Sequence, residues 1–158
     1  MHQLKILKTK EVRELKEALQ QQFGFSLTAD YAYLQNDHER IFIVSKEVTR
    51  IDMEKLRIDR IGLYLGEFKH GQLRLSKEGA QLLAAQAVEN KIELQNVVEL
   101  DSSELKEYFQ GRDVVKELGS ESRLILLRYG ADIFGCARYK ENKILNFLSK
   151  IHYGEVIV

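Results

Sequence analysis

The sequence predicts an α+β protein, in which a first part of mixed helices and strands is followed by a small β-barrel. Two observations lead to this prediction. Residues 123–158 hold short apolar runs, rich in branched and aromatic side chains, that are separated by turn residues such as Gly130 and Asn142. Each run is too short for a typical helix, so strands are expected there. Before residue 123, segments with helical periodicity alternate with strand-like runs.

Composition bounds the class of protein. A chain of 158 residues holds one ordinary domain or two small ones. With 44% hydrophobic and 30% charged residues it is expected to be a soluble globular protein. Lys plus Arg and Asp plus Glu both total 24, so no global basic field indicates a nucleic-acid partner. Neither a signal-peptide core nor a membrane-length apolar span is apparent, so we expect a cytoplasmic protein with no membrane partner.

The first part opens with an amphipathic helix over residues 9–23, which Thr9 is expected to cap and Gly24 to end. Strands are expected over 31–35 and 40–45. The continuous apolar run 41–44 indicates a strand buried on both faces. A short helical turn over 52–56 is the next expected element.

A strand over 58–68, a turn at 69–71 and a returning strand at 73–75 are expected to follow. Ser76 then caps a helix that continues to about Val88. A new strand and helix pattern begins after residues 91–95. We therefore predict two domains, 1–92 and 93–158.

The second part is expected to contain a strand over 96–100 and a helix that begins at Asp101 or Ser102 and is stopped by Gly111. A short strand or extended loop over 112–116 and a hairpin at 140–143 are predicted next. A last strand is expected over 155–158. The single cysteine, Cys136, excludes an internal disulfide, and its apolar strand predicts a buried structural thiol.

Charge is distributed unevenly between the end of the chain and the segment before it. Residues 91–122 hold four basic and eight acidic residues, whereas residues 123–158 hold six basic and three acidic ones. The expected barrel is therefore locally basic, which favours contact with a nucleic-acid backbone.

No catalytic pattern is recognisable. Residues 62–66 contain two glycines but no following Lys-Ser/Thr pair, so a phosphate loop is not indicated. The four histidines lie scattered along the chain without acidic partners at metal-ligand spacing. The sequence therefore predicts a non-enzymatic protein with no cofactor and no metal.

Features suited to binding an RNA backbone are a glycine at a helix end and basic residues on neighbouring strands. An ordinary solvated surface explains any one of these cations as well. Tyr153 could stack on an unpaired base, whereas Tyr129 and Tyr139 are expected in the core. The candidate RNA-binding residues are Gly111, Arg112, Lys116, Arg138, Lys140, Lys143, Lys150 and His152.

Several stretches carry a family resemblance; these are residues 65–69, 73–76, 108–119, 132–138 and 154–155. From Ile61 onward the chain resembles the PUA-containing ribosome-biogenesis proteins of the Nip type. It is also similar to the PUA tail of RNA cytosine methyltransferases of the Nop/Sun/Fmu class. The first part resembles the pre-PUA domain of the Nip-type proteins.

The resemblance implies an α/β pre-PUA domain followed by a PUA-like barrel that binds RNA, with rRNA in ribosome biogenesis or tRNA as the partner. In such folds the RNA surface involves the loop after the first helix and the final strand, here Gly111-Arg112 and residues 150–154. The methyltransferase likeness implies no catalysis, because the chain has no room for a methyl-donor domain and no glycine-rich donor loop.

Two other readings stay open. The first is a protein–protein adaptor of a ribosome-assembly or RNA-modification complex, docking through the 41–44 sheet or the first helix. The second is a small enzyme of unknown reaction.

Overall fold

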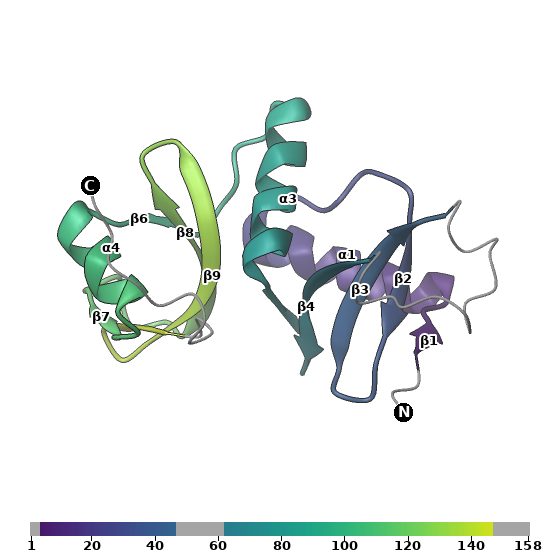
Figure 1. The fold of residues 1–158 in the computed structure, drawn as a ribbon, viewed down its shortest axis with the longest axis horizontal. Helices are drawn as coiled ribbons and strands as arrows, with labels where there is room; N and C mark the ends of the chain where they lie inside the picture. The colour runs from purple at the N-terminus through teal and green to yellow at the C-terminus, as the bar shows by residue number, and fades with distance from the viewer. Residues whose placement is uncertain (1–3, 47–61, 147–158) are drawn as a thin grey trace.

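The computed structural model describes residues 4–46 and 62–146, which form two five-stranded sheets with a helix between them (Figure 1). In chain order the elements are β1 (Lys5–Ile6), α1 (Thr9–Phe23), β2 (Tyr31–Gln35), β3 (Arg40–Ser45), β4 (Leu63–Lys69), β5 (Gln72–Leu75), α3 (Lys77–Glu89), β6 (Val97–Glu99), α4 (Ser102–Phe109), β7 (Val114–Val115), β8 (Arg123–Tyr129), β9 (Asp132–Lys140) and β10 (Lys143–Leu145).

The first sheet has the order β1-β2-β3-β4-β5 with every pair antiparallel. Helix α1 packs against it and has the predicted bounds, because its apolar stripe buries Leu15, Leu19 and Phe23 completely. Gly24 ends the helix with a φ of 77°, as expected. The prediction that Thr9 caps the helix was wrong. The cap position is Lys8, whose backbone N–H donates to the Glu11 carboxylate at 3.2 Å.

Strand β3 is buried on both faces, as its apolar run predicts. Ile41 and Ile43 pack into the core with α1, whereas Phe42 and Val44 pack with Leu34 in a separate cluster. Because Ile41, Ile43 and Val44 are at most 4% exposed, these side chains offer no surface to a protein partner. The structure therefore does not support the adaptor interface expected at 41–44.

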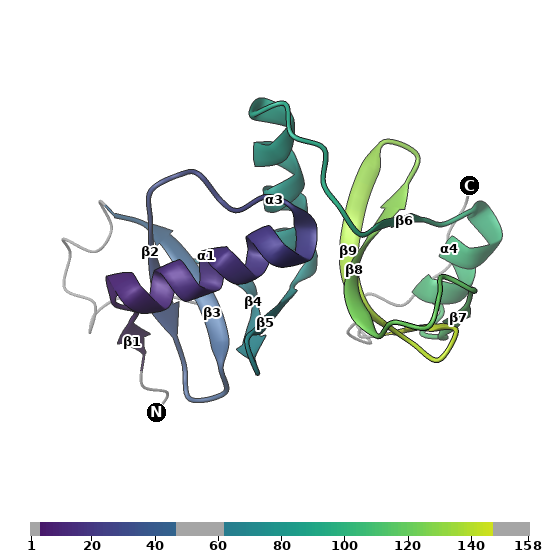
Figure 2. The ribbon, with the colours of Figure 1, turned by 180° about the vertical axis from the view of Figure 1, so that it is seen from behind.

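Helix α3 begins as predicted, with the Ser76 hydroxyl accepting a hydrogen bond from the Gly79 N–H at 2.9 Å. The helix lies directly against β4. A Cβ at Gly79 would stand 2.1 Å from the carbonyl oxygen of Leu65, so only glycine permits this approach. Figures 1 and 2 show α3 standing between the two sheets.

The second sheet has the order β6-β8-β9-β10-β7; β6 pairs with β8 in parallel and the other pairs are antiparallel. It curls round a core that α4 covers, which corresponds to the expected barrel as a half-barrel (Figure 1). Asp101 caps α4 by accepting from the Glu104 N–H at 2.8 Å. The predicted β9–β10 hairpin turns at Glu141 and Asn142, both with positive φ, which matches the right-handed strand twist.

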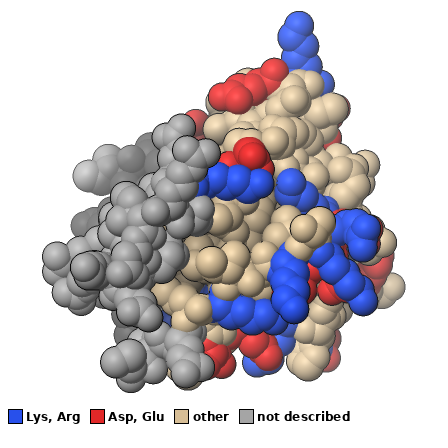
Figure 3. Space-filling view, turned by 90° about the vertical axis from the view of Figure 1, so that its right-hand side faces the viewer, with Lys and Arg blue, Asp and Glu red and all other residues tan. Residues whose placement is uncertain are grey.

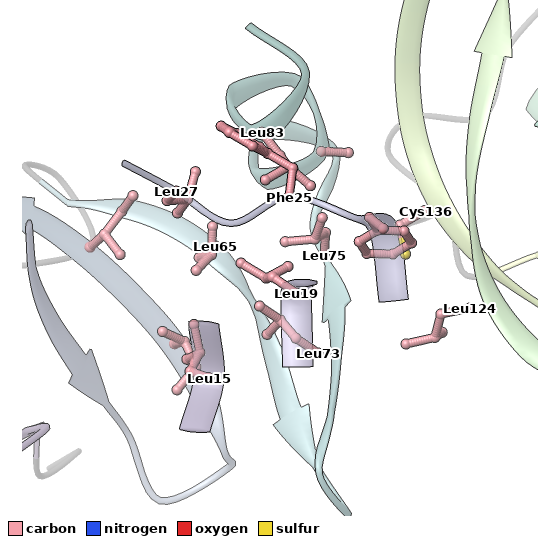
Figure 4. Packing of buried hydrophobic residues seen from close by; sticks show 14 of the residues in the cluster. Leu15, Leu19, Phe25, Leu27, Leu65, Leu73, Leu75, Leu83, Leu124 and Cys136 are labelled. Carbon is pink, nitrogen blue, oxygen red and sulfur yellow. The ribbon is translucent and has the colours of Figure 1, made fainter. Parts of the chain in front are cut away.

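The two sheets share one hydrophobic core. Leu124 and Leu126 of β8 and Cys136 of β9 pack in the same cluster as Leu75 and Phe25 of the first part (Figure 4). Cys136 is buried, as predicted, and burial raises the pKa of its thiol to about 12. The predicted boundary between residues 92 and 93 assigns one sheet to each part of the chain. The shared core, however, contains residues from both sides of that boundary.

Three predicted elements lie wholly or partly outside the described residues: the helical turn at 52–56, the strand start at 58–61 and the last strand at 155–158. Among the described helices, none combines the length and apolar character that a membrane crossing requires.

Candidate nucleic-acid interface

Three of the predicted cations lie on one face of the second sheet. Lys140 of β9 is directly opposite Lys143 of β10, and Arg138 is two residues before Lys140 on the same strand. Opposed residues, and alternate residues of one strand, point to the same side of a sheet. Arg138, Lys140 and Lys143 therefore form one group, here named the cationic face.

The other side of the same strands points into the half-barrel. Ala137, Tyr139 and Ile144 are fully buried there. The Tyr139 hydroxyl accepts from the Leu118 N–H at 2.6 Å and donates to the Lys116 carbonyl at 2.9 Å. Tyr139 is thus a core residue, as predicted, and its ring is not available to stack on a base. Tyr129 is only partly buried.

The cationic face looks toward the first sheet. The Arg138 guanidinium donates to the side-chain carbonyl of Gln72, on β5, at 2.6 Å. Lys140 and Lys143 are exposed. In the described part of the chain no carboxylate lies within ion-pair distance of any of the three cations. Within residues 4–46 and 62–146, no acidic neighbour therefore neutralises their charges.

The remaining predicted residues lie elsewhere. Gly111 follows α4 with a φ of 86°, and the exposed Arg112 comes next. Lys116 reaches back to α4, where its ammonium group lies 3.0 Å from the Glu104 carboxylate. The structure thus does not gather all the candidates in one patch, and it pairs Lys116 with an acid. Lys150 and His152 lie outside the described residues.

Sequence reasoning missed a polar cleft beside the cationic face. It has a volume of about 880 Å³ and lies between the C-terminal part of α1, the β4–β5 turn and residues 118–124. We name it the amide cleft for its lining side chains, which include Gln21, Gln22, His70, Gln72, Asn96 and Ser122. The only hint of the cleft in the sequence was the polar run Gln20-Gln21-Gln22. No local sequence pattern shows that this run contacts residues 50 to 100 positions away.

Hydrogen bonds hold the walls of the amide cleft in place. The Gln22 amide donates to the Leu73 carbonyl and accepts from the Leu73 N–H, both at 2.9 Å, so it closes the open edge of β5. Asn96 donates to the Gln22 backbone carbonyl at 2.6 Å. Arg123 donates to the carbonyls of Leu118 and Glu121 and lies over the ring of Tyr139, 5.2 Å from its centroid.

The far end of the molecule has a different electrostatic character. Figure 3 views the end that carries β1 and the start of α1, and basic and acidic side chains lie next to one another there. One such pair is Lys5 with Glu11, at 2.7 Å. Paired charges of this kind form an ordinary solvated surface. The cationic face is thus the better candidate for a phosphate backbone.

Comparison with known proteins identifies the second sheet more closely. Residues 95–151 match a family model described as the methyltransferase RsmF PUA domain. Several relatives named ribosomal RNA small subunit methyltransferase F are similar over a longer stretch. The Vibrio cholerae serotype O1 (strain M66-2) protein is 25% identical over 141 residues, which is 89% of this chain and 28% of that protein. The Shewanella woodyi protein is 28% identical over 90% of this chain and 28% of its own length. The Aeromonas salmonicida protein is 36% identical over 61% of this chain and 19% of its own length.

These relatives correct one prediction. The expectation of a non-enzymatic protein is contradicted, because every relative named above is a methyltransferase. The chain spans less than a third of the length of these relatives. The pre-PUA likeness of the first part stays a prediction. From residue 95 to residue 151, the chain is similar to the PUA domain of this methyltransferase family.

Proposed function

We propose that this chain binds small-subunit ribosomal RNA and holds it for methyl transfer, with the cationic face contacting the phosphates. Support comes from the PUA-domain match over 95–151 and from the three relatives that are named rRNA methyltransferases. The observation that carries the proposal is the placement of Arg138, Lys140 and Lys143 on one face, with no acidic partner among the residues that the structure describes.

The charge arrangement is suited to this role despite a net charge of zero. Phosphate contacts displace condensed counterions, so a few local cations are enough to drive association. Paired strands hold these cations close together before RNA binds. Binding therefore costs less conformational entropy than it would for cations on a mobile loop. Contacts of this kind position the RNA without reading its sequence.

The loop after α4 is a second proposed contact zone. Gly111 brings the main chain to the surface, and the Asn146 amide donates to the carbonyls of Tyr108 and Arg112 at 2.6 and 2.9 Å. The loop is therefore anchored to the chain just after β10. Lys150 and His152 remain candidates from the sequence alone. Lys116 is expected to contribute less, because its ion pair with Glu104 would have to break.

The test is a titration of labelled small-subunit rRNA with the double variant Lys140→Ala/Lys143→Ala. We expect weaker binding and a salt dependence of log K that is shallower by about 0.7–0.9 for each lost phosphate contact. Fluorescence anisotropy at several salt concentrations measures both quantities.

The matched control is Lys10→Ala, an exposed cation in the first turn of α1 at the far end of the molecule. It should leave affinity and salt slope unchanged. An unchanged slope for the double variant, or an equal loss for Lys10→Ala, would remove the cationic face from the proposal.

A further inference from the structure

The amide cleft differs from the cationic face in its chemistry. Most of its polar side chains are amides and hydroxyls, which both donate and accept hydrogen bonds. Two residues of opposite charge, Glu121 and Arg123, contribute to the lining, and the Arg123 guanidinium is already used by two main-chain carbonyls. The interior therefore suits a neutral polar group better than a phosphate, a lipid chain or an apolar peptide.

Part of this polar lining has no hydrogen-bond partner among the described residues. In the part of the chain that the structure describes, the side chains of Gln21, His70, Ser120 and Ser122 make no hydrogen bond, and all four are exposed in the cleft. Gln22, Asn96 and Arg123, in contrast, are engaged in holding the walls. The cleft thus combines a rigid frame with free donors and acceptors.

Position links the cleft to the cationic face. Gln72 lines the cleft, and its side-chain carbonyl accepts the hydrogen bond from Arg138. An RNA strand whose phosphates follow Arg138, Lys140 and Lys143 therefore passes the cleft mouth. The volume of about 880 Å³ lies within the range of about 300–1,000 Å³ that is typical for sites of drug-sized ligands, so a nucleobase fits.

We propose that the amide cleft takes up an unpaired nucleobase of the RNA that the cationic face holds. This inference rests on the proposed function. The base edge, with its own donors and acceptors, would bond to Gln21, Ser122 and their neighbours. Only an unpaired nucleotide exposes that edge, so the cleft selects single-stranded RNA over a duplex. Among the described cleft residues there is no Phe, Tyr or Trp and the one aromatic ring is that of His70, so we expect hydrogen bonds to contribute more to recognition than stacking.

The test compares two RNA probes: a labelled hairpin with a mixed-sequence loop, and the same strand made fully double-stranded by its complement. The variant is Gln21→Ala/Ser122→Ala in the full chain. We expect it to lose about threefold to tenfold affinity for the loop RNA per hydrogen bond removed. Affinity for the duplex and the salt slope should stay as in the unchanged protein, because no charge is altered.

The matched control is Gln20→Ala/Ser103→Ala, which removes the same side-chain types at exposed positions outside the cleft. Suppose that Gln21→Ala/Ser122→Ala binds the loop RNA with wild-type affinity while Lys140→Ala/Lys143→Ala binds it more weakly. That result overturns the proposal that the cleft holds a base, and it leaves the proposed role of the cationic face in place. Equal losses on loop and duplex also overturn it. Failure of the unchanged chain to bind either RNA overturns the proposed function and the cleft together.

Discussion

At the scale of single residues, environment decides the chemistry of the side chains that sequence reasoning selected. Tyr139 and Cys136 lie on one strand but point to opposite sides of the sheet. Tyr139 braces the segment that leads to the amide cleft, through hydrogen bonds to the main chain of Lys116 and Leu118. Cys136 lies in the core shared by both sheets, next to Leu75. Neither side chain is available for RNA.

Burial predicts an inert thiol at Cys136. Its pKa of about 12 keeps the sulfur protonated, so the thiolate fraction at pH 8 is only on the order of 10⁻⁴. We expect a disulfide reagent to react slowly with the native protein and rapidly, with one equivalent, in denaturant. Because unfolding returns the pKa toward 9, the free energy of unfolding should also fall as the pH rises above 9. The Cys136→Ser variant gives the reagent blank, and rapid native labelling would show that the thiol is accessible.

At the scale of the element, helix α3 is positioned by its close approach to a strand. Gly79 lies in the first turn of the helix, where its N–H donates to the Ser76 hydroxyl, and its Cα lies against the Leu65 carbonyl of β4. Two turns further along the same buried face of the helix, Gln86 accepts from the Thr28 N–H and donates to the Tyr31 hydroxyl, both at 2.9 Å. The helix is therefore tied to two segments of the first part.

Gly79→Ala should destabilise the protein, although alanine favours a solvent-exposed helix by roughly 0.5–1 kcal/mol over glycine. The added methyl group would overlap the Leu65 carbonyl, and overpacking of this kind costs about 1–3 kcal/mol. Urea unfolding followed by circular dichroism measures the change. Gly135→Ala is the control, since its nearest neighbour would be the Tyr108 hydroxyl at 3.8 Å and the methyl group has room. A stabilised Gly79→Ala protein would mean that α3 does not touch β4.

At the scale of the whole molecule, the shared core joins the two sheets into one unit. Leu124, Leu126 and Cys136 bury their side chains against the first part, and Arg138 bonds to Gln72 across the same boundary. The Gln95 N–H also donates to the Phe23 carbonyl at 2.7 Å. The amide cleft exists only because the two parts are held in this arrangement.

The shared core predicts a single unfolding transition. Circular dichroism and the exposure of the Cys136 thiol should give the same urea midpoint, and Leu124→Ala should lower both by the same amount. A large-to-small change at such a buried site costs about 2–5 kcal/mol. Separate midpoints would show that residues 1–92 and 93–158 unfold independently. Ala85→Ser, at an exposed position of α3, serves as the control for a mild change.

The sequence by itself determined most of the described helices and strands and several of their ends, although it missed β1 and the cap of α1. Helix α1 could be delimited because its apolar spacing and Gly24 act within a few residues of each other. Ser76, Asp101 and the Glu141-Asn142 turn are local signals of the same kind. The buried state of Cys136 and Tyr139 follows from the apolar runs that contain them. These features depend on backbone geometry and hydrophobic periodicity over short stretches.

Only the tertiary structure decided which residues form a site. Lys140 and Lys143 share a face because of the strand register. Lys116 instead forms an ion pair with Glu104, because β7 packs against α4. The amide cleft joins residues from α1, the β4–β5 turn and the segment before β8. Contacts between residues so distant in sequence depend on how the chain closes long loops around one core, and no local sequence pattern predicts that closure.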